Sequence, residues 1–208
     1  MRAVAGTLPI GGPLTWMSDD SGPDRGPKPA RGLIAAAQSG DTAAFGSLVE
    51  LHQQRVFRTA RSILGNDADA QDAAQETFLR AFRHIASFDA QRDFPAWLYK
   101  LTVNACRDVI RRRRRSESSE TNTGPVVSPD VGPFETAALN EQRVLTRRAL
   151  ARLPYKERAA ITLRDLEGLS TAEVAAALGT TEATVRSQVS AGRAKLRRYI
   201  LGEKRSKP

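Results

Sequence analysis

The segment Glu167–Arg198 constrains this chain most, because it has the pattern of two short helices joined by a tight turn. Thr171 is placed to cap a first helix and Thr181 a second, with Gly179 where the chain must turn. Apolar residues recur at helical spacing in both helices, and the basic side chains of the second lie off that stripe. This pattern is typical of proteins that bind duplex DNA. The alternative is an ordinary surface helix pair with a solvated basic face.

Charge and composition favour an anionic partner and limit the kinds of protein that this chain can be. The net charge is +9 and the isoelectric point is near 10.4. A single cysteine, Cys106, excludes an internal disulfide, and two histidines do not assemble a convincing metal site. No apolar run approaches the length of a membrane span or the core of a signal peptide. We therefore expect a cytoplasmic protein without membrane insertion.

The chain divides into two helical stretches separated by a Pro- and Ser-rich segment. Residues 1–32 are expected to be a disordered extension, 33–115 a first helical domain, 116–134 a flexible tether, 135–201 a second helical domain, and 202–208 a basic tail. The predicted fold is all-α, with two small helical domains joined by a flexible linker. The two domains are expected to move independently.

Local signals predict where the helices of the first domain begin. Asp41 is placed to cap a helix that ends near Leu64, and Asp93 to cap a later one that carries Pro95 in its first turn. Between them, Asp67 or Asp69 opens a helix. The apolar residues of this middle helix that are expected to face the core include Phe78, Leu79 and Phe82.

The middle helix also carries a cluster of acidic and amide side chains among small alanines. An acidic face would repel DNA phosphates, so it suggests docking onto a basic protein partner. A solvated helix start, favoured by the helix dipole, explains the same residues equally well. The cluster comprises Asp67, Asp69, Asp72, Gln75 and Glu76.

The next helix combines aromatic and basic residues. Aromatic faces beside arginines are used to hold unstacked bases along a charged groove. A core role explains Phe82 and Trp97 well, but it explains Asn104 and the run Arg111–Arg115 poorly. Because the Asn104 amide can both donate and accept, it could hydrogen-bond the edge of an extruded base. The alternative explanation of the five arginines is a solvated helix end that the helix dipole favours.

The order of these segments closely resembles bacterial sigma factors of the extracytoplasmic-function group. The resemblance rests on DAQDAAQETFLRAFRHI, then SFDAQRDFPAWLYKLTVNACRDVIRRRRR, then the tether, then LARLPYKERAAITLRDLEGLSTAEVAAALGTTEATVRSQVSAGRAKLRR. It covers about residues 33–201. The motifs are specific in combination, although the helix-turn-helix or the acidic helix alone would be weak evidence.

The resemblance implies which surfaces bind which partners. The first half is implied to bind the clamp helices of the largest subunit of core RNA polymerase and to capture the minus-10 promoter element. The second half is implied to read the minus-35 element and to contact the flap of the second-largest subunit. The implied polymerase-binding residues are Asp69, Asp72, Gln75 and Glu76. The charges alone explained these residues equally well as a docking face or as a solvated helix start, and the resemblance favours the docking face.

Carried over to matching positions, the resemblance also implies the DNA-binding residues. A pocket around a flipped non-template base is expected at Phe88, Phe94, Leu101 and Asn104, and such a pocket would favour melting as well as specificity. The remaining implied minus-10 residues are Arg107, Arg111, Arg112, Arg113, Arg114 and Arg115. The implied minus-35 residues are Thr184, Arg186, Ser187, Gln188, Ser190 and Arg193.

The resemblance implies a transcription initiation factor, in an envelope or stress response, with an anti-sigma protein as inhibitor. No catalytic residue, cofactor or metal is expected, because nucleotidyl transfer belongs to the polymerase. A stand-alone helix-turn-helix regulator is the alternative, and it would need a sensor or dimerisation surface in the first half. One departure from the family concerns Gln188 and Ala191, where many relatives carry arginine. Gly192 replaces a common alanine and is expected to soften the helix by about 1 kcal/mol.

Overall fold

The computed structural model describes residues 31–117 and 145–205, and the regular structure within these two ranges is helical. The predicted extension over residues 1–30, the tether over 118–134 and the end of the tail at 206–208 lie outside the described residues. No helix in the two described ranges is long and apolar enough to span a membrane. The predicted all-α class is confirmed.

The N-terminal helical unit consists of α1 to α4. Asp41 caps α2 by accepting from the backbone N–H of Ala43 and Ala44, and Gly65 ends α2 with a left-handed backbone (φ 87°). Asp93 accepts from the N–H of Ala96 and so caps the start of α4. Both N-caps were predicted from the sequence. The elements are α1 (Arg31–Gln38), α2 (Thr42–Leu64), α3 (Asp67–His84), the 3₁₀ turn η2 (Ile85–Ser87) and α4 (Phe94–Glu117).

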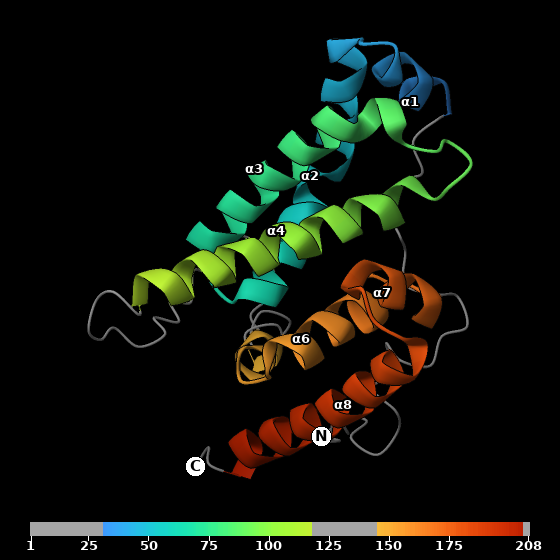
Figure 1. Ribbon diagram of the computed structural model, residues 1–208. Helices are drawn as coiled ribbons and strands as arrows, with labels where there is room; N and C mark the ends of the chain where they lie inside the picture. The colour runs from blue at the N-terminus through green and yellow to red at the C-terminus, as the bar shows by residue number, and fades with distance from the viewer. Residues whose placement is uncertain (1–30, 118–144, 206–208) are drawn as a thin grey trace, which may run out of the picture.

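Helix α3 begins at Asp67, one of the two residues predicted to open it. Asn66 is the N-cap, and its side chain accepts from the N–H of Asp69, so that Asp67 and Asp69 lie in the first turn. The core-facing side of α3 is made of small residues, namely Ala70, Ala73, Thr77 and Ala81. A seam of small residues lets neighbouring helices approach closely. The three helices α2, α3 and α4 accordingly pack against one another (Figure 1).

The C-terminal helical unit begins with a helical segment at residues 145–151 and continues through α6 to α8. Its elements are α6 (Tyr155–Ile161), the π-helical turn η3 (Thr162–Leu166), α7 (Thr171–Leu178) and α8 (Glu182–Arg205). Helix α6 and η3 follow one another without a break from Tyr155 to Leu166. The π-helical turn is rare in proteins and widens the helix by one residue at this point.

The two helical units pack against each other in the structure and share a core. One buried apolar cluster contains Tyr99, Val103 and Cys106 of the first unit together with Leu163 and Val174 of the second. Helix α7 lies alongside α4, as Figure 1 shows, and α6 also contacts α2. The sequence pattern could not predict this docking, because each unit's stripe of apolar residues is compatible with packing inside that unit alone.

Candidate docking and nucleic-acid surfaces

The acidic side of α3 is accessible, and apolar residues continue it toward the end of the helix. Asp72 and Gln75 are exposed. Leu79 and Phe82, which were predicted to face the core, are 51% and 52% exposed. That prediction was wrong because the small residues of α3 occupy the core side and leave the large ones on the flank. Phe82 keeps an edge-on contact with Phe45, with ring centroids 5.0 Å apart.

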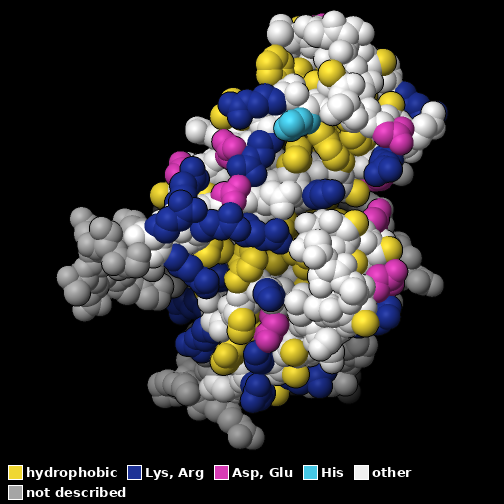
Figure 2. Space-filling view, viewed as in Figure 1, with side chains coloured by type: hydrophobic (Ala, Val, Ile, Leu, Met, Phe, Trp, Pro, Cys, Tyr) yellow, Lys and Arg dark blue, Asp and Glu magenta, His cyan; other side chains and the backbone are white. Residues whose placement is uncertain are grey.

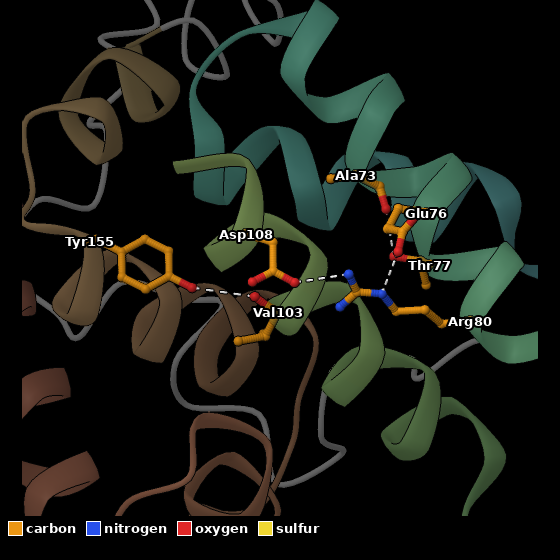
Figure 3. Close-up of polar contacts among 7 residues, drawn as sticks. All are labelled: Ala73, Glu76, Thr77, Arg80, Val103, Asp108 and Tyr155. Atoms are coloured by element: carbon orange, nitrogen blue, oxygen red, sulfur yellow. Dashed lines mark hydrogen bonds and ion pairs between the residues drawn. The ribbon is translucent and has the colours of Figure 1, made fainter. Parts of the chain in front are cut away.

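Glu76 lies at the same face but is already paired. Its Oε1 lies 2.7 Å from Nε of Arg80, and Nη2 of Arg80 lies 2.8 Å from Oδ2 of Asp108 on α4 (Figure 3). The guanidinium therefore bridges two carboxylates on two helices. Pairs of this kind, partly shielded from solvent, fix geometry more than they add stability. Glu76 thus connects the acidic face to α4.

Asp69 lies at the edge of this face. Its Oδ2 accepts from Nδ2 of Asn66 at 2.7 Å and lies 3.9 Å from Nη1 of Arg113. A groove between α3 and α4 brings the four predicted docking residues together with arginines of α4. Its lining residues are Asp69, Asp72, Gln75, Glu76, Leu79, Val109, Arg112 and Arg113.

The aromatic residues predicted to hold a base form an internal cluster. Phe88 and Phe94 are 6% and 4% exposed. Phe88 lies 4.8 Å from Trp97 between ring centroids, and Phe94 lies 5.4 Å from the imidazole of His52. Rings so deeply buried cannot stack on a base in this arrangement. They instead support the half-buried Trp97 and Leu101 from beneath.

The polar part of the predicted minus-10 surface follows α4. Asn104 is half-buried. Arg107 donates from Nη2 to the carbonyl of Leu178 at the end of α7, at 3.0 Å, so part of this surface is covered by the C-terminal helical unit. Arg111 to Arg115 are exposed at the end of α4. Figure 2 shows Lys and Arg side chains gathered along α4.

The two helices predicted within Glu167–Arg198 are both present, with one change of N-cap. Ser170, not Thr171, is the N-cap of α7, and it forms a reciprocal capping box with Glu173. Thr181 accepts from the N–H of Thr184 at 3.2 Å at the start of α8, as predicted. Gly179 ends α7 with a left-handed backbone (φ 64°). The helix-turn-helix geometry thus follows from local side chain to backbone bonds.

Several predicted minus-35 residues lie on the open face of α8. Arg186, Ser187 and Ser190 are exposed, and Arg186 makes only a surface ion pair with Glu182 at 3.3 Å. Thr184 is half-buried and shares a hydrogen bond with Thr181. A groove along this face is lined by Arg164, Thr171, Val185, Arg186, Val189, Ser190, Arg193, Ala194 and Arg197. No pattern in the sequence pointed to Arg164, which lines the groove from η3.

Two of the predicted minus-35 residues, Arg193 and Gln188, are partly buried. Nε and Nη2 of Arg193 donate to the two oxygens of Asp165, at 2.9 and 2.5 Å, and the Asp165 side chain is 3% exposed. These hydrogen bonds raise the pKa of Arg193 further. The π-helical turn carries Asp165, so this pair ties α8 to η3. Gln188 is half-buried, and its Oε1 lies buried without a hydrogen-bond partner in the described residues.

The Cys106 thiol is buried. Burial raises the pKa of the Cys106 thiol to about 12, so that the thiolate needed for reactivity is scarce. Within residues 31–117 and 145–205, no group of three His, Cys, Asp or Glu side chains is arranged to hold a metal ion.

Comparison with known proteins decides the family. Residues 48–116 match the Sigma-70 region 2 family, and residues 143–196 match Sigma-70 region 4. The ECF RNA polymerase sigma factor SigM of Mycobacterium tuberculosis is 35% identical over 168 residues, which cover 81% of this chain and 83% of SigM. This chain is an ECF RNA polymerase sigma factor. The SigE factor of Mycolicibacterium smegmatis is 38% identical over 78% of this chain and 65% of its own length.

Solved structures of sigma factors have the same fold. CnrH, solved in complex with the cytosolic domain of CnrY, is 33% identical and superposes with a TM-score of 0.58 over 80% of this chain and 93% of CnrH. The sigma factor RpoE of Bartonella quintana, solved with the anti-sigma factor NepR, is 25% identical with a TM-score of 0.66 over 75% of this chain and 96% of RpoE. The fold of this sigma factor is thus that of its family.

Proposed function

We propose that this sigma factor binds core RNA polymerase in the cytoplasm, directs it to promoters with minus-35 and minus-10 elements, and promotes melting of the DNA. The observation that carries the proposal is the presence in one chain of an open acidic and apolar face on α3 and an open basic groove on α8. A protein partner fits the first surface and DNA fits the second. Joined in one chain, they recruit that partner to DNA.

The proposed polymerase site is the face of α3 that carries Asp72, Gln75, Leu79 and Phe82. Exposed carboxylates favour approach to a basic partner and fix its orientation. Two half-exposed apolar side chains in one turn add area that a docked helix would remove from water. Asp69 and Glu76 lie at the edge of this surface, where they pair with Arg113 and Arg80.

The proposed minus-10 surface is the side of α4 that carries Leu101, Asn104 and the arginine run. The arginines are exposed and can contact phosphates, which gives affinity without sequence information. Asn104 and Leu101 lie one helical turn apart and can contact a base edge and a base face. Phe88 and Phe94 hold this side of α4 in place from the core.

The proposed minus-35 surface is the groove of α8 around Arg186, Ser187 and Ser190. Arginine suits guanine O6 and N7 in the major groove, whereas serine discriminates less. Because Arg193 is paired with Asp165, it contributes position more than base contact. Arg164 and Arg197 line the same groove and supply phosphate contacts.

A protein inhibitor and a role in a stress or envelope response are part of the proposal. The solved complexes of CnrH with CnrY and of RpoE with NepR, both similar in fold to this chain, support a proteinaceous anti-sigma partner. A stand-alone regulator is not favoured, because both halves match sigma regions and the first half carries the docking face instead of a sensor.

The test is run-off transcription with core polymerase and a pool of genomic promoter fragments. Adding this chain should produce discrete promoter-specific transcripts, and the variant Asp72→Lys should lose them together with affinity for core polymerase. Asp72 is exposed, so the variant should fold normally. Glu50→Lys, a matched charge reversal at an exposed position of α2, should transcribe like the wild type. Equal activity of Asp72→Lys and wild type would move the docking site elsewhere.

A further inference from the structure

The five arginines at the end of α4 point in two different directions. At 3.6 residues per turn, successive side chains are about 100° apart around the helix axis. Arg112 and Arg113 therefore lie within about 60° of Val109, which is 5% exposed and lines the groove between α3 and α4. The other three arginines lie about 120° or more from Val109, on the side of α4 that carries Asn104.

The groove between α3 and α4 has walls of opposite charge. Its α3 wall carries Asp72 and its α4 wall carries Arg112. Leu79 of α3 and Val109 of α4 give the same groove apolar area, and the Leu79 side chain is 51% exposed. A partner seated in this groove therefore meets a negative wall, a positive wall and apolar side chains at once.

Ion pairs cross from α3 to α4 at two places along the groove. Toward the start of α3, Oδ2 of Asp69 lies 3.9 Å from Nη1 of Arg113. Toward the end of α3, Arg80 connects Glu76 to Asp108 of α4, with ion pairs of 2.7 and 2.8 Å (Figure 3). These pairs fix the two walls relative to each other, so the groove is formed before a partner binds.

Asp72 and Arg112 face the groove with charges that are open to a partner. Both residues are exposed. Neither side chain forms an ion pair or a hydrogen bond with another residue in the described ranges 31–117 and 145–205. Opposite charges that stand apart on two walls of one groove match a partner that carries both signs of charge.

We infer that this groove binds a helix of core polymerase that has basic side chains along one flank and acidic side chains along the other. The basic flank lies over Asp72, the acidic flank lies over Arg112, and apolar residues between them cover Leu79 and Val109. Arg112 is then a protein-docking residue and not a minus-10 DNA contact. The inference rests on the proposed function, because it concerns the partner of the same α3 face.

A helix suits this groove for geometric reasons. A third helix laid on two packed helices contacts both of them at interaxial distances of about 8–10 Å. Residues three and four apart lie along one flank of a helix, so a helix can keep its basic and acidic side chains on separate flanks. Reversing the direction of the bound helix would exchange the flanks and bring like charges together. The two walls therefore also set the direction of the partner helix.

The test measures the affinity of full-length variants for core polymerase without DNA, by isothermal titration calorimetry. Arg112→Glu places a carboxylate against the acidic flank of the partner helix, so the Kd should rise by about tenfold or more. The matched control is Arg114→Glu, the same charge reversal at an exposed position two residues along α4. Its Kd should stay within about twofold of the wild-type value. Circular dichroism should show the same helix content in all three proteins.

The order of the two variants should reverse when DNA binding is measured. Holoenzymes are assembled with saturating amounts of each variant and titrated with a premelted promoter. Arg114→Glu should bind this DNA more weakly and with a shallower salt dependence, because it has lost a phosphate contact. Arg112→Glu should bind it with the wild-type affinity.

Two results would overturn the inference. One is a wild-type affinity of Arg112→Glu for core polymerase, and the other is an equal loss of that affinity in both variants, which would indicate a general effect of charge. Asp72→Lys, the variant that tests the proposed function, is measured in the same titrations. If it loses affinity while Arg112→Glu does not, the polymerase docks on α3 alone, and the inference fails while the proposed function stands.

Discussion

A methyl group placed on Gly192 would lie 2.4 Å from Cδ1 of Ile161, so the backbone of α8 touches the side chain of α6 directly. The sequence suggested that this glycine only softens the helix. The structure instead gives it a packing role, because Gly192 is buried where α8 crosses α6. A side chain at this position would push the two helices apart.

Gly192→Ala should therefore destabilise the protein. Overpacking costs about 1–3 kcal/mol, which exceeds the gain of about 1 kcal/mol in helix propensity. We expect the melting temperature to fall by roughly 3 °C, measured by circular dichroism. Ile161→Val removes the clashing Cδ1 atom, so Gly192→Ala should cost less in that background. A rise in melting temperature for the single variant would show that propensity dominates.

Arg193 should contribute mainly to stability, whereas Arg186 should contribute mainly to DNA binding. Arg193→Ala leaves the buried Asp165 carboxylate without its partner and should cost about 1–3 kcal/mol in the free energy of unfolding. Arg186→Ala loses only a surface ion pair, should change stability by less than about 0.5 kcal/mol, and should weaken minus-35 binding. Urea unfolding and promoter binding by the holoenzyme separate the two effects. Similar stabilities of the two variants would contradict the structural role of Arg193.

His52 should make stability depend on pH. Burial lowers its pKa from 6.5 to about 4 in the folded state. Between these values the unfolded chain binds the proton and the folded chain does not, so stability is complete above pH 6.5 and is lost as pH falls toward 4. From pH 7 to pH 5 the expected loss is about 2 kcal/mol.

Urea unfolding of two histidine variants isolates this contribution. His52→Leu should remove about 2 kcal/mol of the difference between pH 7 and pH 5. His84→Gln, at an exposed histidine, should keep the difference. If both variants retain the wild-type pH dependence of stability, His52 is not its cause.

Asn104 should matter for capturing a base, not for the fold. It is half-buried on α4 beside Leu101, and Asn104→Ala removes its amide without removing a large apolar group. We expect this variant to impair opening of duplex promoters more than initiation on a premelted bubble. Permanganate footprinting and run-off transcription on the two templates measure this ratio. Equal loss on both templates would argue against base capture.

Local signals predicted most helix starts, including the caps Asp41, Asp93 and Thr181, and missed the cap of α7 by one residue. Ser170 is followed directly by Thr171, which can also cap a helix. Pattern alone cannot choose within such a run, because each member offers the same side-chain oxygen. The final choice depends on where the helix packs.

Long-range packing explains the other differences. The exposure of Phe82 follows from the side of α3 that meets α4, because the small residues of α3 occupy that side. Phe88 is buried because it packs on Phe94 and Trp97. Glu167 finds its partners 108 and 68 residues away in the chain, at Thr59 and Tyr99. No periodicity within a helix encodes a contact at that separation. The proposed docking residues could be chosen from the sequence only through family resemblance.

The bridge from Glu76 through Arg80 to Asp108 ties the proposed docking face of α3 to α4, which carries the proposed minus-10 residues. A partner seated on α3 therefore also sets the direction in which the arginines of α4 point. The point on the DNA where strand separation begins is then determined by the position of the partner, and a weakening of this bridge would displace it without changing any residue that touches DNA.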